Sequence, residues 1–242
     1  MTNEITPTSR LHPLLTLDAR PTAFGLDVSK AALLVIDMQN DFGAEGGMFE
    51  RAGIDISAIQ KAVPPTAQVL VAARACGIPI VYLKMGFKTD LSDVGPLDSP
   101  NHMRHQLMGL GAMAKAPNGD ESRVLIRDTW NTGILPALAP QAGDIVLYKH
   151  RFSGFFETEL HGLLQQRGIK QLIVTGCTTS ICVESTIRDA MFRDYSCVLL
   201  EDCTAEPLGK NLPRSNHEAS LLTIQVLLGW VSTSDKFIQS MR

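Results

Sequence analysis

The chain has 242 residues, of which 45% are hydrophobic and 19% charged, and this size suits one large α/β domain with a sizeable core. The formal net charge is −3, and no run of five or more basic residues occurs, which argues against nucleic acid or anionic membrane as a partner. The N-terminus lacks the apolar stretch of a signal peptide and no window has the roughly 18 apolar residues of a spanning helix, so we expect a soluble, cytoplasmic protein.

The order of apolar runs along the chain indicates an N-terminal arm and one domain. Residues 1–27 are rich in Pro, Thr and Leu without clear periodicity, and we interpret them as an arm that lies on the domain 28–242 or on a neighbouring subunit. Residues 31–36 are continuously apolar up to Asp37, as expected for a strand covered on both faces in a parallel sheet. Further strands are predicted from similar runs at 78–83, 144–148, 171–175 and 196–200, with a short sixth strand around Val231.

Helical stretches separate these runs, each marked by apolar residues at the spacing of one buried helix face. The three sets are Val69, Ala72, Ala73 and Cys76; Phe156, Leu160, Leu163 and Leu164; and Val183, Ile187, Ala190 and Met191. Because strands alternate with helices, we predict a three-layer α/β/α fold on a doubly wound, mostly parallel sheet of about six strands. Residues 85–142 break the alternation with many Gly, Pro, Asn and Met residues, which indicates an insertion that covers a pocket.

Two charged residues stand at the carboxyl ends of predicted strands, where ligands bind in parallel sheets. Asp37 ends the first run as a partly desolvated carboxylate able to exchange a proton, although a turn or helix-cap aspartate is the simpler alternative. Lys149 follows the run 144–148, and a buried lysine there needs a carboxylate or a developing anion as its partner, although surface lysines are commoner.

A cysteine completes this set, because Cys182 follows the run 171–175 through a short turn and lies where a helix begins. The free N–H groups and the dipole of a helix start are expected to lower the thiol pKa, and the same N–H groups can bind an oxyanion. The alternative, a small buried structural side chain, fits the other four cysteines: Cys76, Cys177, Cys197 and Cys203. Together, Asp37, Lys149 and Cys182 predict a covalent site with a base, a cation and a nucleophile.

Three stretches of the sequence resemble one known family. The segments ALLVIDMQNDF, YKHRFSGFF and VTGCTTSICVESTIRDA are similar to the isochorismatase-like cysteine hydrolases, from about Ala31 to the end of the chain. The resemblance implies an Asp–Lys–Cys triad at Asp37, Lys149 and Cys182, and a cis peptide bond between Cys177 and Thr178. It also implies an oxyanion hole formed by the N–H groups of Thr178 and Cys182, with no cofactor required.

Within this family, several segments look most like the members that hydrolyse ureidoacrylate: PQAGDIVLYKHRFSGFFETEL, CVESTIRDAMF, VLLEDCT, LLGWVS and Ser99-Pro100-Asn101. The resemblance therefore implies a cysteine-dependent amidohydrolase that cleaves a C–N bond of a small ureido or carbamoyl compound through a thioester-type intermediate. Two departures bear on the substrate: Thr178-Thr179-Ser180 replaces the commoner Ala-Thr-Asn or Ala-Thr-Asp, and Asn131 stands where those members have an aspartate.

Residues around the substrate are less constrained by the sequence. Asn40, Trp130 and Phe156 are candidates for substrate binding, since each lies near a predicted strand end or in the insertion. A substrate carboxylate would need a donor, and spacing alone does not choose among Arg104, Lys84 and Arg151. Metal-dependent members of the family carry an Asp-x-His pair after the second strand, but MGFKTDLSD has no histidine there, and we expect His102 and His105 to be ordinary polar residues without a metal.

Three alternatives to this function remain open. The first is an amidase for another small amide, such as a biuret-like, carbamoyl amino acid or lactam substrate. The second is a non-catalytic binding member of the fold, which an intact triad disfavours, and the third is cleavage of a vinyl ether, which needs no thiol. The apolar segment 221–230 and the N-terminal arm also suggest a homo-oligomer.

Overall fold

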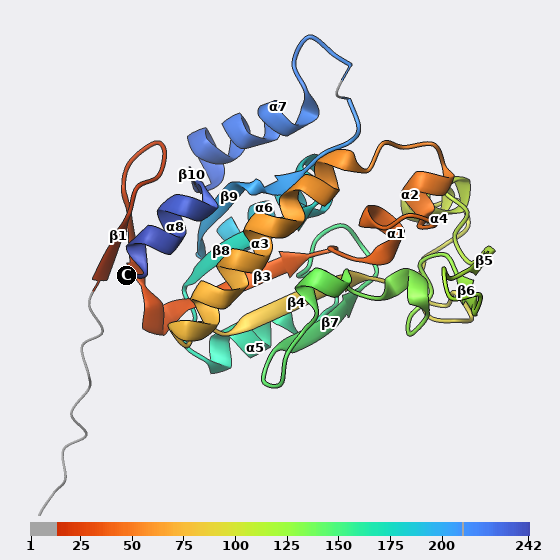
Figure 1. The fold of residues 1–242 in the computed structure, drawn as a ribbon, viewed down its shortest axis with the longest axis horizontal. Helices are drawn as coiled ribbons and strands as arrows, with labels where there is room; N and C mark the ends of the chain where they lie inside the picture. The colour runs from red at the N-terminus through yellow and green to blue at the C-terminus, as the bar shows by residue number, and fades with distance from the viewer. Residues whose placement is uncertain (1–13, 210) are drawn as a thin grey trace, which may run out of the picture.

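The core of the molecule is a six-stranded sheet in a computed structural model that describes residues 14–209 and 211–242 (Figure 1). All its described strand pairs are parallel, in the order β10-β9-β8-β3-β4-β7. The strands are β3 (Ala31–Ile36), β4 (Ile80–Met85), β7 (Ile145–Lys149), β8 (Gln171–Cys177), β9 (Ser196–Ala205) and β10 (Trp230–Ser232). The predicted sheet of about six strands is confirmed, although β8 and β9 run two and five residues further than their apolar runs.

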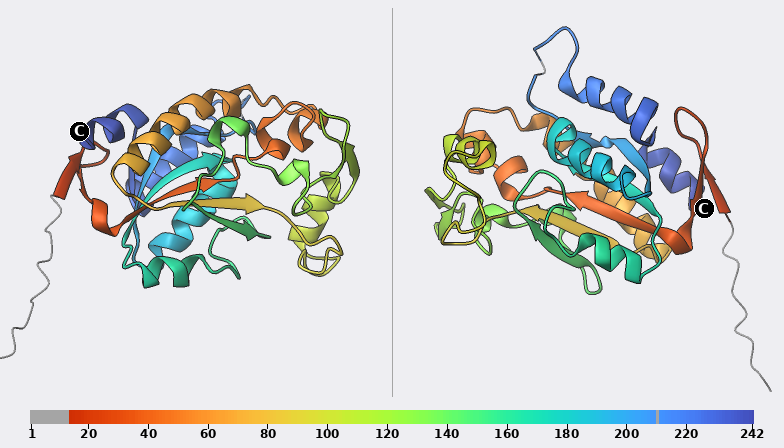
Figure 2. Two further views of the ribbon diagram at one scale, coloured as in Figure 1. Left: turned by 60° about the horizontal axis from the view of Figure 1, so that its bottom comes forward. Right: turned by 180° about the vertical axis from the view of Figure 1, so that it is seen from behind.

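Helices cover both faces of this sheet, which gives the predicted three layers. Figure 2 shows α3 (Ser57–Ala75) and α8 (Ser234–Ser240) over one face and α5 (Leu160–Gln166) and α6 (Glu184–Met191) over the other. A further helix, α7 (Asn216–Thr223), continues into the π-helical turn η5 (Ile224–Leu228), which packs beside α6.

The predicted apolar stripes agree with these helices except at one residue. Val69 and Ala73 of the first stripe are buried in α3, and Val183, Ile187 and Ala190 of the third are buried in and before α6. In the second stripe, Leu160 and Leu164 are buried in α5. Phe156 precedes that helix and is 42% exposed, so its place in the stripe is wrong.

The described part of the N-terminal arm is a β-hairpin on its own domain. Strands β1 (Leu14–Leu17) and β2 (Phe24–Asp27) pair antiparallel and lead into the short turn η1 (Val28–Lys30). Between them, Arg20 exchanges two backbone hydrogen bonds with Val231 of β10, at 2.8 and 2.9 Å. The hairpin therefore caps an edge of the sheet that would otherwise expose unpaired backbone groups. The first 13 residues of the predicted arm lie outside the described residues.

Short elements gather beyond the carboxyl ends of β3 and β4, at the end of the molecule away from the hairpin (Figure 1). After β3 come α1 (Asn40–Gly43) and α2 (Met48–Arg51). The insertion 85–142 supplies α4 (Pro100–Leu107), β5 (Met113–Lys115), β6 (Glu121–Arg123), η2 (Trp130–Thr132) and η3 (Pro136–Leu138). Within residues 14–209 and 211–242, no helix has both the length and the apolar character needed to cross a bilayer.

Candidate active site

We refer to residues 40–51 and 85–142, which lie beyond the ends of β3 and β4, as the cover. Three predicted side chains from the ends of three strands meet below this cover. The Lys149 ammonium lies 2.8 Å from the Asp37 carboxylate and donates to the Cys182 sulfur at 3.3 Å. Lys149 also donates to the Arg151 carbonyl at 3.2 Å, which directs its Nζ. Asp37 and Lys149 are completely buried and Cys182 is 5% exposed, so their charges interact in a medium far less polarisable than water.

The backbone at the strand ends places these groups close together. In β8, an added Cβ at Gly176 would lie 2.0 Å from the Ile36 carbonyl oxygen, so only glycine lets β8 approach the end of β3. Asp37 itself has φ of +53°, a left-handed conformation that aspartate tolerates better than most residues. The peptide bond between Cys177 and Thr178, at the end of β8, is cis, as the family resemblance implies.

Cys182, the predicted nucleophile, lies in a π-helical turn, η4 (Thr179–Val183), that leads into α6. The residue that follows β9 holds this turn, because the Glu206 carboxylate accepts hydrogen bonds from the Ser180 N–H at 3.1 Å and its hydroxyl at 2.6 Å. Thr179 contacts the Thr204 hydroxyl and the His217 ring nitrogen Nδ1, each at 3.0 Å. The unpredicted extension of β9 therefore positions the cysteine.

Burial dominates the electrostatics of the three groups. It raises the pKa of Asp37 above the usual range, although the Lys149 ammonium and the Cys182 thiol both oppose this shift. Burial also disfavours the Lys149 ammonium, but Asp37 and Cys182 together outweigh it and raise the pKa of Lys149. Desolvation is the largest of these effects, so the Asp37 carboxylate takes up a proton more readily than an exposed aspartate does.

The expected lowering of the Cys182 thiol pKa is wrong for this structure. Burial raises that pKa, the neighbouring Asp37 raises it further, and the Lys149 ammonium only partly opposes both. A helix start favours a thiolate that solvent can reach, whereas here the charge would form beside a carboxylate in an apolar interior. The resting residue is therefore a thiol, and a thiolate requires proton transfer to a neighbour.

A cavity of about 220 Å³ opens onto the Cys182 sulfur and is mostly apolar. Its lining residues are Phe42, Met48, Phe49, Met85, Arg104, His105, Met108, Leu125, Phe152, Thr178, Ile181, Cys182 and Leu208. Arg104, His105, Met108 and Leu125 belong to the insertion, so the prediction that this segment covers a pocket is confirmed.

The predicted substrate-binding residues lie outside this cavity. Asn40 is buried and donates to the Trp130 carbonyl at 2.7 Å, so it fastens η2 to α1. Trp130 lies beside Gly46, and Phe156 contacts His150 and Arg151. Their predicted contact with substrate receives no support from the structure, because none of the three lines the cavity.

Several wall residues were not found from the sequence. Met48, Phe49 and Phe152 were not among the sequence candidates, and His105 was expected to be an ordinary polar residue of the insertion. The one local signal for His105 is its helical spacing from Asn101, whose carbonyl it contacts through Nδ1 at 2.7 Å. Among the residues that the structure describes, no group of three or more His, Cys, Asp or Glu side chains is arranged to hold a metal.

One buried carboxylate joins the cover to the sheet end. Asp41 accepts the backbone N–H of Met48 at 3.0 Å and of Leu125 at 2.7 Å, and it also accepts the side-chain amide of Asn131. Two of these three donors belong to cavity-lining residues, so Asp41 ties the backbone of Met48 to that of Leu125. Burial raises the pKa of Asp41 to about 6, while its hydrogen bonds, first that from Asn131, act in the other direction.

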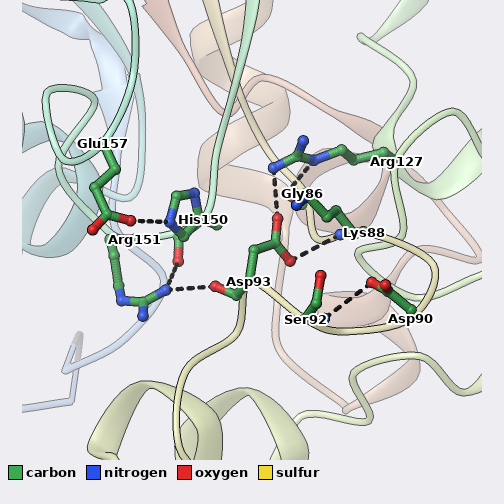
Figure 3. A network of polar contacts seen from close by, with 9 residues as sticks. All are labelled: Gly86, Lys88, Asp90, Ser92, Asp93, Arg127, His150, Arg151 and Glu157. Atoms are coloured by element: carbon green, nitrogen blue, oxygen red, sulfur yellow. Dashed lines mark hydrogen bonds and ion pairs between the residues drawn. The ribbon is translucent and has the colours of Figure 1, made fainter.

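A second hollow, of about 740 Å³, includes part of β7 and lacks Cys182 from its lining. Figure 3 shows its polar network, in which Arg127 pairs with Asp93 at 2.7 Å and Arg151 donates to the Asp93 and His150 carbonyls. Its charged side chains bond mainly to one another and to backbone. The three predicted residues therefore belong with the smaller cavity, which is lined by Cys182.

Comparisons with known proteins agree with the family resemblance of the sequence. Residues 31–236 match the isochorismatase domain family. The chain is similar to ureidoacrylate amidohydrolase RutB of Methylorubrum extorquens, with 39% identity over 91% of this chain and 86% of the relative. It is equally similar to the RutB of Serratia proteamaculans, with 39% identity over 94% and 89% of the two chains.

Two solved structures share the fold. A cysteine hydrolase from Pseudomonas syringae pv. phaseolicola has a TM-score of 0.74 and 28% identity, covering 95% of this chain and 97% of that one. N-carbamoylsarcosine amidase from Thermoplasma acidophilum has a TM-score of 0.62 and 26% identity, covering 85% and 97%.

Proposed function

Because this chain belongs to the isochorismatase family, we propose that it is a cysteine-dependent amidohydrolase for a small ureido or carbamoyl compound, with ureidoacrylate as the leading candidate. The observation that carries the proposal is the contact of one buried ammonium, Lys149, with both Asp37 and Cys182 below a small cavity. The substrate class is supported by the relatives, whose names specify a ureidoacrylate or a carbamoyl substrate.

In the first half of the proposed reaction, Asp37 takes the proton of the Cys182 thiol. Its raised pKa makes it a stronger base than an exposed aspartate, and Lys149 stabilises the thiolate as it forms. The thiolate attacks the carbonyl carbon, and the N–H groups of Thr178 and Cys182 stabilise the resulting oxyanion. Asp37 then returns the proton to the departing nitrogen, so the C–N bond breaks and an S-carbamoyl group, a thioester-type intermediate, remains on Cys182.

In the second half, a water molecule attacks the thioester and gives its proton to Asp37. The C–S bond breaks, the thiolate regains a proton, and the carbamoyl group leaves as carbamate, which decomposes to ammonia and carbon dioxide. We propose that no metal or other cofactor takes part, since the thiolate supplies the nucleophile and Lys149 the positive charge.

The cavity supports a substrate of limited size. Its volume of about 220 Å³ lies below the roughly 300–1,000 Å³ of pockets for drug-sized ligands. Three phenylalanine rings line it, those of Phe42, Phe49 and Phe152, and flat apolar walls suit a small planar compound.

We also propose a cytoplasmic protein that associates with copies of itself. Self-association is supported by exposed apolar side chains within the predicted segment 221–230, where Val226 and Leu227 are 63% and 70% exposed. The cytoplasmic location is supported only by the sequence features described above.

Specificity constants for ureidoacrylate, biuret, N-carbamoyl amino acids and simple amides test the function. We expect ureidoacrylate to rank first and Cys182→Ala to abolish turnover with a nearly unchanged melting temperature. Cys203→Ala serves as the matched control, because it removes another buried thiol and should lower stability more than the chemical step. A simple amide preferred by about tenfold, about 1.4 kcal/mol of transition-state stabilisation, would overturn the ranking, and an active Cys182→Ala would overturn the mechanism.

A further inference from the structure

We propose that Arg104 binds the carboxylate of the substrate and thereby selects anionic ureido compounds over neutral ones. The inference rests on the proposed function and names the group that would recognise the end of the substrate away from the carbamoyl carbon.

The chemistry of the cavity requires a cation for an anionic substrate. Its walls are mostly phenylalanine, methionine, leucine and isoleucine side chains, which cannot replace the water lost by a carboxylate. An unpaired carboxylate in such a space would be strongly disfavoured, whereas a guanidinium can bind both oxygens through two parallel hydrogen bonds.

Other basic groups near the site are already engaged. Lys149 contacts Asp37 and Cys182. Lys84 donates to the Tyr148 hydroxyl at 2.8 Å and lies over the same ring. Arg151 donates to the Asp93 and His150 carbonyls and lies over Phe156, in the second hollow (Figure 3).

Arg104 differs from these groups in both position and state. It lines the cavity that contains Cys182, and its side chain is solvent-exposed. Its guanidinium has no hydrogen-bond or ion-pair partner within the part of the chain that the structure describes. This guanidinium is therefore free to turn toward a carboxylate bound in the cavity.

The neighbouring residue fixes Arg104 on the cavity wall. His105 is only 5% exposed, and it contacts the Asn101 carbonyl at 2.7 Å and the rings of Phe87 and Phe152. A carbonyl can only accept, so Nδ1 is the donor. Burial lowers the pKa of His105, which leaves the ring neutral and makes Arg104 the charged group of this wall.

The experiment compares ureidoacrylate with its methyl ester, which keeps the carbamoyl group and removes the negative charge. Ammonia from the carbamoyl end is measured for the wild type, Arg104→Gln and Arg104→Lys. Lys115→Gln is the matched control, because it removes one positive charge from an exposed position of the same insertion outside the cavity.

We expect Arg104→Gln to lower kcat/KM for ureidoacrylate by about tenfold or more, mainly through KM, and to change kcat/KM for the ester by less than about twofold. Arg104→Lys should recover part of the loss, and Lys115→Gln should resemble the wild type. An equal loss on acid and ester would show a structural role and overturn the proposal, as would an unchanged constant for the acid. A wild type inactive on both compounds would instead refute the proposed function, and the inference with it.

Discussion

Asp41 provides a quantitative test of how the cover is held on the sheet. The carboxylate is buried and receives hydrogen bonds from Met48, Leu125 and Asn131. We propose to replace it by asparagine, which has nearly the same size and cannot ionise. The amide group of Asp41→Asn faces at least one N–H donor, so the variant should be less stable than the wild type at neutral pH.

The pH dependence has a definite sign. Burial raises the Asp41 pKa from 3.8 to about 6, so the folded state holds this proton more tightly than the unfolded state does. The resulting stabilisation is fully present below about pH 3.8 and is lost as the pH rises through about 6. At 1.36 kcal/mol per pKa unit, the full contribution is about 3 kcal/mol, of which about 2 kcal/mol is lost between about pH 4.5 and about pH 7.5.

Urea unfolding of both proteins across this range measures the effect. The difference in unfolding free energy, wild type minus Asp41→Asn, should fall by about 2 kcal/mol as the pH rises from about 4.5 to about 7.5. Other titrating groups, including His105, cancel in this difference because both proteins contain them. The exposed Asp235→Asn is the control and should follow the wild type. Parallel curves for wild type and Asp41→Asn would refute the assignment of a raised pKa to this buried anchor.

Three further predictions concern the site and the sheet. Dialysis against a strong chelator should leave activity unchanged, and a loss that zinc, iron or manganese restores would contradict the metal-free mechanism. Lys149→Met should lower the free energy of unfolding by about 3–5 kcal/mol near pH 8, because it leaves the Asp37 carboxylate buried without its partner. The loss should be smaller near pH 5.5, where the unpaired Asp37 is protonated more readily. Equal losses of unfolding free energy at the two pH values in chemical denaturation would argue against the ion pair. Gly176→Ala should lower the unfolding free energy by at least about 3 kcal/mol, because its Cβ would collide with the backbone of Ile36. The control Gly162→Ala has open space around its Cβ in α5 and should be neutral or stabilising. Similar melting temperatures for the two variants would contradict the packing argument.

The sheet, and the meeting of Asp37, Lys149 and Cys182 at its end, could be predicted from the sequence because both depend on local patterns. The apolar run before Asp37 marks a buried strand, and the carboxyl ends of parallel strands converge whatever the loops do. The walls depend instead on long-range bonds such as that between Asp41 and Leu125, 84 residues apart, and no local spacing reveals them. Hence Arg104 could be named from the sequence only as one of three candidates, and Asn40 and Trp130 were expected in a cavity that they do not line.

The departure at position 131 also acquires a different meaning. Asn131 is completely buried and bonds Ser122 as well as Asp41, so it belongs to the cover rather than to the cavity wall. The replacement of aspartate by asparagine at this position therefore affects how the cover is held on the sheet. A direct effect on substrate contacts does not follow from its position.

The small volume above Cys182 imposes an order on the proposed catalytic cycle. A cavity of about 220 Å³ leaves little room for water beside a bound substrate, so the amine product must leave before the hydrolytic water can enter. The covalent intermediate therefore persists after the amine product has left and before the carbamate is released, and this order of steps produces ping-pong kinetics. During that interval a small external amine could occupy the vacated space as readily as water, and the same carboxylate that activates water would activate it, so the enzyme would transfer the carbamoyl group instead of hydrolysing it.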